Sequence, residues 1–184
     1  APYFGVDVTP DEYGQALDAL RSGPSSAEWQ SLIANDWYQQ AQALADQHRF
    51  FHWELEFPEA FFEVSNSTAA WRDAGGRGFD AVIGNPPYVR IQTLRGVDTS
   101  STGFYDRHYA TAQGSYDIYC LFVEKAWALT SRELGYIVPS KFMEARYGTP
   151  LRTLCAPALK RVVDFTDQQV FQDSSAINYT CLLF

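Results

Sequence analysis

The chain has 184 residues, of which 46% are hydrophobic and 16% are aromatic, and its formal net charge is −8. This composition is sufficient for one sizeable hydrophobic core and excludes a disordered chain. The longest apolar runs are only a few residues and the first residues lack the pattern of a signal peptide, so we expect a soluble, cytoplasmic protein without a membrane-spanning helix.

The spacing of the cysteines and histidines and the net charge of the chain argue against further classes of function. The three cysteines, Cys120, Cys155 and Cys181, are widely spaced, and the three histidines form no paired ligand motif with them. We therefore expect neither a metal site nor a disulfide framework. The acidic net charge argues against a DNA-binding surface built by this chain alone, because phosphate contacts require clustered lysine and arginine.

Two helices are predicted near the N-terminus. Thr9-Pro10-Asp11-Glu12 is a capping-box pattern with proline at the first helical position, and Gly23 ends the periodic segment, so a helix is predicted from Pro10 to Ser22. Ser25-Ser26-Ala27-Glu28 repeats the pattern and begins a longer helix, in which apolar residues recur at helical spacing as far as Leu44. The two helices should pack as an αα-hairpin.

An aromatic and acidic segment follows these helices. Apolar and polar residues alternate from Trp53 to Phe57, which predicts a strand or extended segment that ends at Pro58. The alternation would place Glu54 and Glu56 together on a solvent face, and this favours a solvated surface over a metal or acid–base cluster. Small and polar residues dominate from Glu63 to Arg77, where a loop is predicted.

The next segment joins a strand pattern to a rigid polar tip. The short apolar run from Phe79 to Ile83 is bounded by glycines, as expected for a parallel strand that is buried on both faces. Asn85-Pro86-Pro87-Tyr88, called the tip below, follows at the carboxyl end of this strand. Open α/β sheets bind their ligands at that edge, so the tip is the candidate active site.

The tip suits methyl transfer to a planar, weakly nucleophilic amine. The side-chain oxygen of Asn85 and the carbonyl of Pro86 can each accept one amine hydrogen as the nitrogen becomes tetrahedral and gains positive character. The prolines Pro86 and Pro87 fix φ and donate no N–H of their own, and Tyr88 offers a flat face for stacking. The alternative is a proline turn, with asparagine as a turn former and tyrosine as packing.

The segment from Val89 to Gly114 has no strong periodicity, and we expect a long loop whose basic and aromatic residues suit a flipped nucleotide and its phosphates. A disordered surface loop is the alternative. Ser115 is predicted to cap the next helix, with Asp117 in its first turn. Apolar residues cover more than one face of that helix, so it should be packed between layers.

The remaining elements are predicted from short apolar runs and turn residues. They are a strand from Leu134 to Ser140, a short helix from Thr149 to Ala158 that Pro157 breaks, and strands from Lys160 to Phe165 and from Ala176 to Phe184.

Three blocks of this sequence resemble the adenine-specific DNA methyltransferases of bacterial restriction–modification and phage-defence systems, in the gamma-type motif order. NPPY, the tip, is the catalytic signature of that family. FHWELEFPE at residues 51–59 is similar to a segment that precedes NPPY in its large fused type II members, of the IIS or IIG kind. GSYDIYCLFVEKA at 114–126 and GYIVPSKF at 135–142 match the family's order after NPPY.

The resemblance implies a fold and a domain division. Residues 53–184 would be the carboxyl half of a Rossmann-like, S-adenosylmethionine-dependent methyltransferase sheet, hence a partial catalytic domain, and residues 1–52 a helical hairpin insertion. The family's glycine-rich cofactor turn precedes NPPY and has no counterpart before Gly78, so most of the S-adenosylmethionine pocket should lie outside this chain. No cofactor-binding residue is therefore assigned, and the chain by itself should be inactive and prone to self-association.

The resemblance also implies roles for individual residues. Asn85, Pro86, Pro87 and Tyr88 would form the catalytic tip, with Tyr88 and Phe171 stacking on a flipped adenine of double-stranded DNA bound by the parent enzyme. A methyltransferase that acts on protein glutamine or on RNA guanine is one alternative, because such enzymes carry NPPY-type motifs. A non-catalytic scaffold or binding module is another, which the acidic charge and the missing cofactor turn favour.

Overall fold

The computed structural model describes residues 5–65, 68–166, 170 and 179–184. The chain forms two compact units that divide between His52 and Trp53. In the described residues, no helix is both long enough and apolar enough to cross a membrane.

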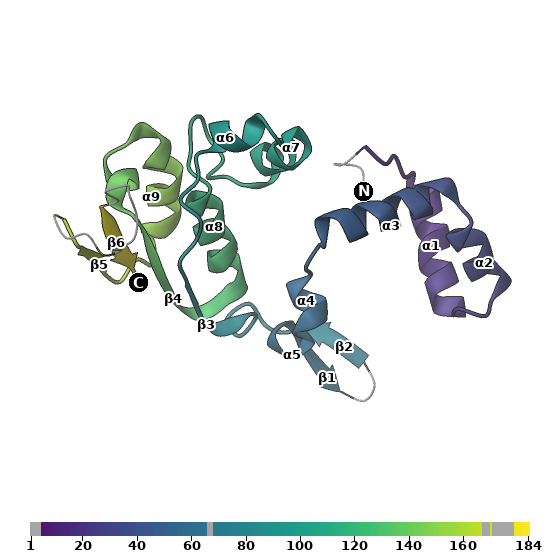
Figure 1. Ribbon diagram of the computed structural model, residues 1–184. Coiled ribbons are helices and arrows are strands. Elements are labelled where there is room, and N and C mark those ends of the chain that lie inside the picture. Colours follow the sequence, from purple (N-terminus) through teal and green to yellow (C-terminus); the bar gives the residue numbers. More distant parts are fainter. Residues whose placement is uncertain (1–4, 66–67, 167–169, 171–178) are drawn as a thin grey trace. The chain divides into compact units, whose positions relative to one another are not determined.

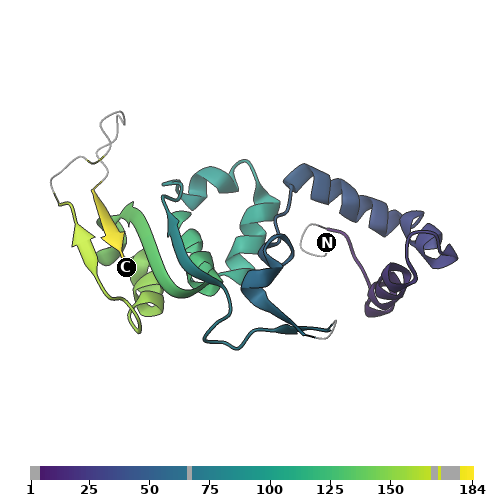
Figure 2. The same ribbon diagram turned by 90° about the horizontal axis from the view of Figure 1, so that it is seen from below.

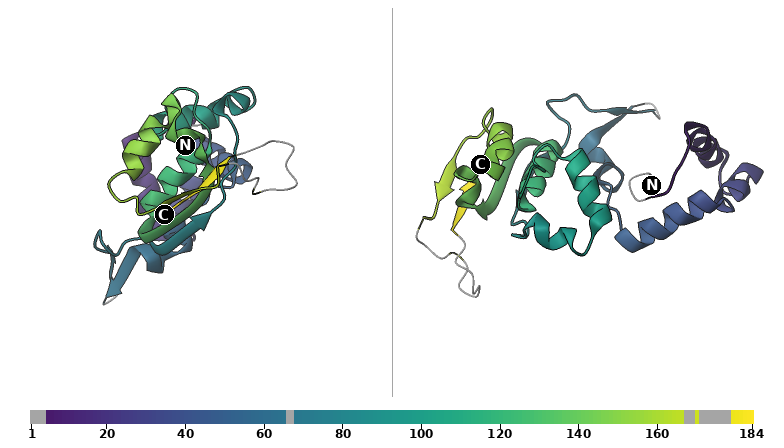
Figure 3. Two further views of the ribbon diagram at one scale, coloured as in Figure 1. Left: turned by 90° about the vertical axis from the view of Figure 1, so that its left-hand side faces the viewer. Right: turned by 90° about the horizontal axis from the view of Figure 1, so that it is seen from above.

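The first unit consists of α1 (Pro10–Ser22), α2 (Ala27–Ile33) and α3 (Asp36–His48) (Figure 3). The capping box before α1 is confirmed, because the Glu12 carboxylate accepts a hydrogen bond from the Thr9 N–H at 2.8 Å while the Thr9 hydroxyl accepts one from the Glu12 N–H at 3.3 Å. Each group satisfies a backbone donor that the helix start would leave unpaired.

The single long second helix that was predicted is wrong, because α2 and α3 are separate helices. The Asn35 side chain accepts a hydrogen bond from the Trp37 N–H at 3.2 Å and so begins a new helix after Ile33. The helical spacing of apolar residues continues across this break, because the spacing depends on which face is buried and not on whether the helix is continuous. Asparagine is a favoured residue at a helix start, and here it begins the second of the two helices. The core of this unit is small and is formed by Ala16, Ala19 and Leu32.

The second unit is a mixed α/β structure, which confirms the predicted fold class (Figure 1). Its helices are α4 (Trp53–Glu56), α5 (Pro58–Phe61), α6 (Ile91–Arg95), α7 (Thr99–His108), α8 (Tyr119–Leu129) and α9 (Thr149–Cys155). Its strands are β1 (Phe62–Ser65), β2 (Thr68–Trp71), β3 (Phe79–Gly84), β4 (Thr130–Pro139), β5 (Val162–Asp164) and β6 (Thr180–Leu183). Two short 3₁₀ helices, Ser140–Met143 and Arg146–Gly148, follow β4.

Four of these strands form one sheet in the order β3-β4-β6-β5 (Figure 2). β3 and β4 are parallel, whereas β6 pairs antiparallel with both β4 and β5. Alternate residues of β4, including Tyr136 and Val138, pack with buried residues of α8, α9 and β6 in the main core. The predicted strands at β4, β5 and β6 and the predicted helix at α9 are confirmed, although residues 176–178 of the last predicted strand lie outside the described residues.

The strand before the tip is confirmed as β3, but the prediction that both its faces are buried is wrong. Ile83 is 83% exposed, and within the described residues β3 pairs with β4 alone. The apolar run therefore indicates a strand of which only one side is packed. Val82 lies on that side and contacts the core. In this structure β3 is an edge strand with an uncovered face.

The predicted strand from Trp53 to Phe57 is also wrong, because α4 and α5 occupy this segment. Trp53, Phe57 and Phe61 recur at intervals of four and all meet the ring of Phe79, at centroid distances of 5.4–5.6 Å. An interval of four residues is compatible both with one turn of a helix and with the two-residue period of a strand. The sequence pattern therefore suggested a strand where the contacts are those of helices. Pro58 stands at the first position of α5 and so begins a helix there.

Two predicted loops contain regular structure. Between Glu63 and Arg77 the chain forms most of the β1–β2 hairpin, in which Phe62 lies opposite Trp71 with ring centroids 4.3 Å apart. Between Val89 and Gly114 it forms α6 and α7, and the Asp98 side chain caps α7 by accepting from the Ser101 N–H at 3.0 Å. The hairpin and the two helices depend on a few contacts between pairs of residues rather than on a periodic pattern of apolar residues.

The predicted helix cap at Ser115 is wrong as well. α8 begins only at Tyr119, since the residues before it pair with the chain that leaves the tip: the Ile118 N–H donates to the Val89 carbonyl at 2.8 Å, and the Ile91 N–H to the Tyr116 carbonyl at 3.1 Å. The prediction that α8 buries more than one face is confirmed, because the consecutive residues Tyr119, Cys120 and Leu121, which point to different sides of the helix, are all buried.

Candidate active site

The tip lies directly after β3, at the end where the parallel strands β3 and β4 both finish. Asn85 and Pro87 are exposed, Pro86 is buried and Tyr88 is half-buried. Gly84 precedes them at a close contact, because a Cβ there would lie 2.9 Å from Cζ of Tyr136. Glycine at the end of β3 therefore leaves room for the end of the Tyr136 ring, which a larger residue would have to displace.

Tyr88 is held from two sides. Its hydroxyl donates a hydrogen bond to the backbone carbonyl of Ile137 in β4 at 3.2 Å, and its ring meets the edge of the buried Tyr119 ring at a centroid distance of 6.4 Å. Burial raises the pKa of Tyr88 to about 12. The phenol therefore stays protonated at neutral pH and serves as a donor and a flat surface rather than as a base.

An open pocket of about 580 Å³, called the carboxyl-end pocket below, lies where β3 and β4 end. Of the four tip residues, Tyr88 lines it. The other lining residues come from the segment after the tip, from the start of α8, from the residues after β4 and from the ends of β5 and β6: Arg90, Asp117, Pro139, Ser140, Lys141, Met143, Glu144, Asp164, Thr166 and Tyr179. The pocket thus combines an aromatic wall with charged groups of both signs.

Phe171, the second predicted stacking residue, lies outside the described residues. The described residues that precede and follow its segment, Thr166 and Tyr179, both line the carboxyl-end pocket. The role of Phe171 stays a prediction.

Three residues that sequence reasoning did not place in the site are connected to it: Asp117 lines the carboxyl-end pocket, and Tyr119 and Tyr147 are linked to Asp117 by hydrogen bonds. Asp117 was predicted to serve the first turn of a helix, but it precedes α8 and pairs with Arg90 in an isolated antiparallel bridge. Its carboxylate accepts a hydrogen bond from the Tyr147 hydroxyl at 3.2 Å, and the hydroxyls of Tyr147 and Tyr119 are 3.0 Å apart. Tyr147 is 30 positions from Asp117, so no local sequence pattern could have joined them.

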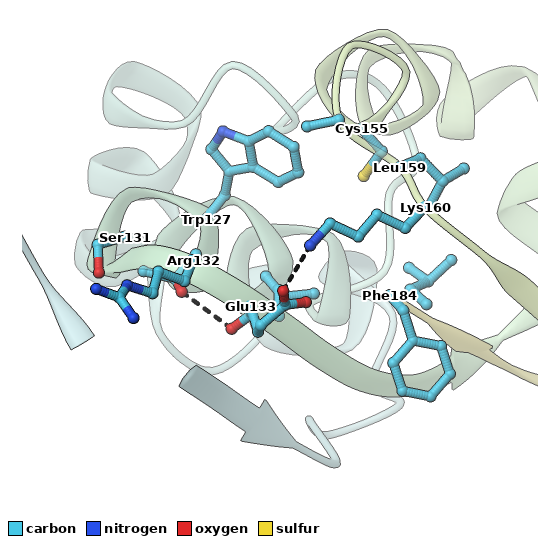
Figure 4. A pocket seen from close by; sticks show the side chains of 12 residues that line it. Trp127, Ser131, Arg132, Glu133, Cys155, Leu159, Lys160 and Phe184 are labelled. Atoms are coloured by element: carbon cyan, nitrogen blue, oxygen red, sulfur yellow. Dashed lines mark hydrogen bonds and ion pairs between the residues drawn. The ribbon is translucent and has the colours of Figure 1, made fainter. Parts of the chain in front are cut away.

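A second, smaller hollow of about 230 Å³ lies at the amino end of β4 (Figure 4). Trp127 and Cys155 form part of its apolar wall, and the ion pair between Lys160 and Glu133 crosses its rim at 2.5 Å. Burial raises the pKa of Cys155 to about 11, so this thiol is neutral and unreactive at neutral pH.

The described residues hold no group of three or more histidine, cysteine, aspartate or glutamate side chains that could bind a metal ion. The residues that line the carboxyl-end pocket offer hydrogen-bond acceptors, an aromatic ring for stacking and charged groups. These are the groups with which a protein orients a flat, amine-bearing ligand.

Comparisons with known proteins relate the chain to modification enzymes. Residues 3–171 match the sequence model of the family described as Eco57I restriction-modification methylase. The chain is 34% identical over 110 residues to the type II restriction enzyme and methyltransferase RM.Eco57I of Escherichia coli, covering 58% of the chain and 11% of that protein. It is 37% identical over 108 residues to the type II methyltransferase M.PaeR7I of Pseudomonas aeruginosa, covering 56% of the chain and 18% of that protein.

A third relative, the type II methyltransferase M.XhoI of Xanthomonas vasicola, is 32% identical over 97 residues, which cover 50% of the chain and 17% of that protein. The aligned regions thus span less than a fifth of the length of each of these curated relatives.

Proposed function

Because this chain belongs to the Eco57I restriction-modification methylase family, we propose that the protein containing it transfers a methyl group from S-adenosylmethionine to the exocyclic amine of adenine in double-stranded DNA. The reaction would be the modification step of a restriction–modification system. The observation that carries this proposal is the position of the tip: Asn85-Pro86-Pro87-Tyr88 follows β3 at the carboxyl edge of the parallel pair, and Tyr88 faces the pocket there.

In this proposal the tip binds the amine that receives the methyl group. The Asn85 side-chain oxygen and the Pro86 carbonyl accept the two amine hydrogens, and their alignment favours the nitrogen as it becomes tetrahedral and positively charged. Pro87 keeps the loop rigid and provides no competing N–H. Tyr88, tied to β4 through its hydroxyl, provides the stacking surface for the base.

The base must leave the duplex to reach the tip. Extruding a nucleotide costs a few kcal/mol, and stacking on an aromatic side chain returns about 1–3 kcal/mol per base. We assign this stacking to Tyr88 on one face of the adenine and to Phe171 on the other. The carboxyl-end pocket, at about 580 Å³, is large enough for a base and its sugar.

S-adenosylmethionine would supply the methyl group from its sulfonium sulfur. The described residues fit the acceptor side of this reaction but not the cofactor side, because no glycine-rich turn links a strand to a helix before β3. We therefore assign the cofactor pocket mainly to other parts of the longer protein, and we expect the 184-residue chain alone to be inactive. Residues 53–184 would be part of the catalytic domain, and residues 1–52 a helical insertion.

DNA contacts would likewise come mostly from elsewhere in the longer protein. The net charge of −8 is unfavourable for phosphate binding, so this chain would contribute the pocket for one nucleotide rather than the duplex-binding surface. The uncovered edge and face of β3, where Ile83 is 83% exposed, would favour self-association if the chain were isolated.

Product analysis tests the proposal. The full-length protein is incubated with methyl-labelled S-adenosylmethionine and either duplex DNA or a ribosomal extract, and the labelled products are identified by mass spectrometry of nucleosides and peptides. N6-methyldeoxyadenosine is the expected product. Label found only in protein glutamine or only in RNA guanine would show that protein or RNA, and not DNA, is the substrate. Absence of label in every fraction would favour a non-catalytic scaffold.

A further inference from the structure

A hydrogen-bonded network lies behind the tip, formed by Tyr119, Tyr147 and Asp117. We propose that this Tyr119–Tyr147–Asp117 network positions the ring of Tyr88, and that Asp117 is the residue on which the network is anchored. This inference rests on the proposed function in that it gives Asp117 a positioning role for the methyl-transfer site. Asp117 acts through the two tyrosines and not by touching the amine.

The contact that transmits the effect is between two aromatic rings. Tyr119 is fully buried in α8, and its ring meets that of Tyr88 edge to face, with an interplanar angle of 81°. The Tyr88 hydroxyl is fixed separately on the Ile137 carbonyl at 3.2 Å. The hydroxyl contact fixes one end of the Tyr88 side chain, and the Tyr119 ring limits rotation about that point. A change in the tilt of Tyr119 would therefore change the surface that Tyr88 offers to a base.

The direction of the hydrogen bonds follows from counting protons. An ionised carboxylate has no proton to donate, so the bond between Tyr147 and Asp117 uses the Tyr147 proton. Tyr147 then has none left for Tyr119, and the Tyr119 hydroxyl must donate to the Tyr147 oxygen across their 3.0 Å separation. The Tyr147 hydroxyl thus donates to Asp117 and accepts from Tyr119, and Asp117 determines the order of the whole network.

The network is intact at neutral pH. Burial raises the pKa of Tyr147 to about 12 and raises the pKa of Tyr119 as well, so both hydroxyls keep their protons. Tyr119 is fully buried, so its hydroxyl cannot turn to bulk water if the Tyr147 hydroxyl moves away from it, and an unsatisfied buried hydroxyl is costly. Removing the carboxylate should therefore disturb Tyr147 and Tyr119 together.

Asp117 is also connected to the tip through the main chain. Its backbone forms the antiparallel bridge with Arg90, two positions after Tyr88, and both Asp117 and Arg90 line the carboxyl-end pocket. The same residue thus fixes the chain leaving the tip and, through its side chain, the ring that supports the tip. Such double anchoring keeps a site in one geometry before its ligand arrives.

The test compares variants of the full-length protein. In Tyr147→Phe and in Asp117→Ala the rate of methyl transfer by DNA-saturated enzyme should fall about tenfold, the effect of one hydrogen bond to a charged group, while the KM for DNA changes little. Asp117→Asn keeps an acceptor oxygen and should restore most of the rate. Tyr116→Phe is the matched control: Tyr116 is fully buried and donates to Asp106 at 3.0 Å, and it should leave the rate unchanged.

Non-additivity identifies the network. If Tyr147 and Asp117 act through one path, the double variant Asp117→Ala/Tyr147→Phe should be no slower than either single variant, whereas independent effects would multiply to about a hundredfold. Multiplying effects, or a loss of rate in Tyr116→Phe equal to that in Tyr147→Phe, would overturn the inference.

A structural readout separates this inference from the proposed function. Tyr88 is labelled with fluorine on its ring in the full-length protein, and its fluorine NMR signal should shift and broaden in Tyr147→Phe but not in Tyr116→Phe. An unchanged signal in Tyr147→Phe would refute the network's role even if DNA is methylated. If the wild-type protein methylates no DNA, the proposed function fails, and the fluorine signal still decides whether the network holds Tyr88.

Discussion

The two hollows at opposite ends of β4 differ in the groups that the chain brings to them. At the carboxyl end, β3 and β4 finish side by side, and the tip, Asp117 and the residues after β4 supply acceptors, an aromatic ring and charges to one pocket. At the amino end, Trp127 and Cys155 form an apolar wall, with one ion pair at the rim (Figure 4).

The difference shows that position in the sheet, rather than concavity, distinguishes these hollows. Parallel strands bring their carboxyl ends together, so loops from neighbouring strands meet there. At the other end of β3 the close contact is structural: Gly78 has φ +111°, and a Cβ there would lie 2.3 Å from the Leu129 carbonyl oxygen. The backbone thus requires glycine at one end of β3, whereas at the other end Gly84 leaves room for the Tyr136 ring.

Replacing Asn85 should have the largest effect. Asn85→Ala removes one of the two proposed acceptors and should lower the rate of methyl transfer by about 100-fold or more, as loss of one preorganised transition-state contact does. DNA affinity should be nearly unchanged, because the proposed contact of the exposed Asn85 side chain would form mainly in the transition state. Single-turnover rates and DNA binding are measured on the same preparation, and an unchanged rate would remove Asn85 from the site.

The next largest effect should come from Tyr88. Tyr88→Ala removes the stacking surface and should weaken both base binding and methyl transfer by about 1–3 kcal/mol. Tyr88→Phe keeps the ring but loses the hydrogen bond to Ile137, and it should fall between Tyr88→Ala and the wild type. Binding to duplexes with a mismatch at the target adenine gives the readout, since such duplexes lower the cost of base extrusion. Equal losses in Tyr88→Phe and Tyr88→Ala would contradict a stacking role.

Alkaline pH should destabilise the structure around the amino-end hollow and the structure around the carboxyl-end pocket in different pH ranges. Burial raises the pKa of Cys155 from about 9 to about 11 and that of Tyr147 from about 10 to about 12. Because the fold favours the protonated forms, their stabilisation is complete below the lower value of each pair and is lost as pH rises through the higher one.

Melting temperatures measured from pH 8 to 12 test these ranges. Cys155→Ala should flatten the decline that begins near pH 9, and Tyr147→Phe the part that begins near pH 10. Identical profiles for the two variants and the wild type would show that neither group contributes.

The smallest effect is expected at the amino-end hollow. Lys160 and Glu133 are each 60% exposed, so Lys160→Met should cost below about 1 kcal/mol of stability and leave methyl transfer unchanged. Chemical denaturation and the single-turnover assay check both expectations. A tenfold loss of rate in Lys160→Met would mean that the amino-end hollow takes part in the reaction.

Sequence patterns predicted those elements whose signals are local. The capping box at Thr9 and Glu12 predicted the start of α1, and the apolar runs predicted strands at β3 and β4, whose parallel pairing with each other the structure adds. Local signals also misled where contacts are distant: Trp53 and Phe57 are helical because they pack on Phe79, and Phe62 and Trp71 pair across a hairpin. These contacts join positions that no single periodic window contains.

The same limit applies to the candidate site. The tip could be predicted because four consecutive residues combine a rigid turn with an acceptor and a ring. Asp117 and Tyr147 could not, because their hydrogen bond depends on how η3 (Arg146–Gly148) is placed against the start of α8. Asp117 had an adequate local explanation as a helix-dipole partner, and this concealed its tertiary contact.

Photochemical crosslinking tests most directly whether the reaction takes place at the carboxyl-end pocket. After the methylated position in DNA has been mapped, 5-iodouracil replaces the target adenine, and the full-length protein is irradiated on this DNA and digested for mass spectrometry. The base should crosslink to Tyr88, with Tyr88→Phe retaining a crosslink at the same position and Tyr88→Ala losing it. A crosslink at Trp127, in the amino-end hollow, would contradict the account.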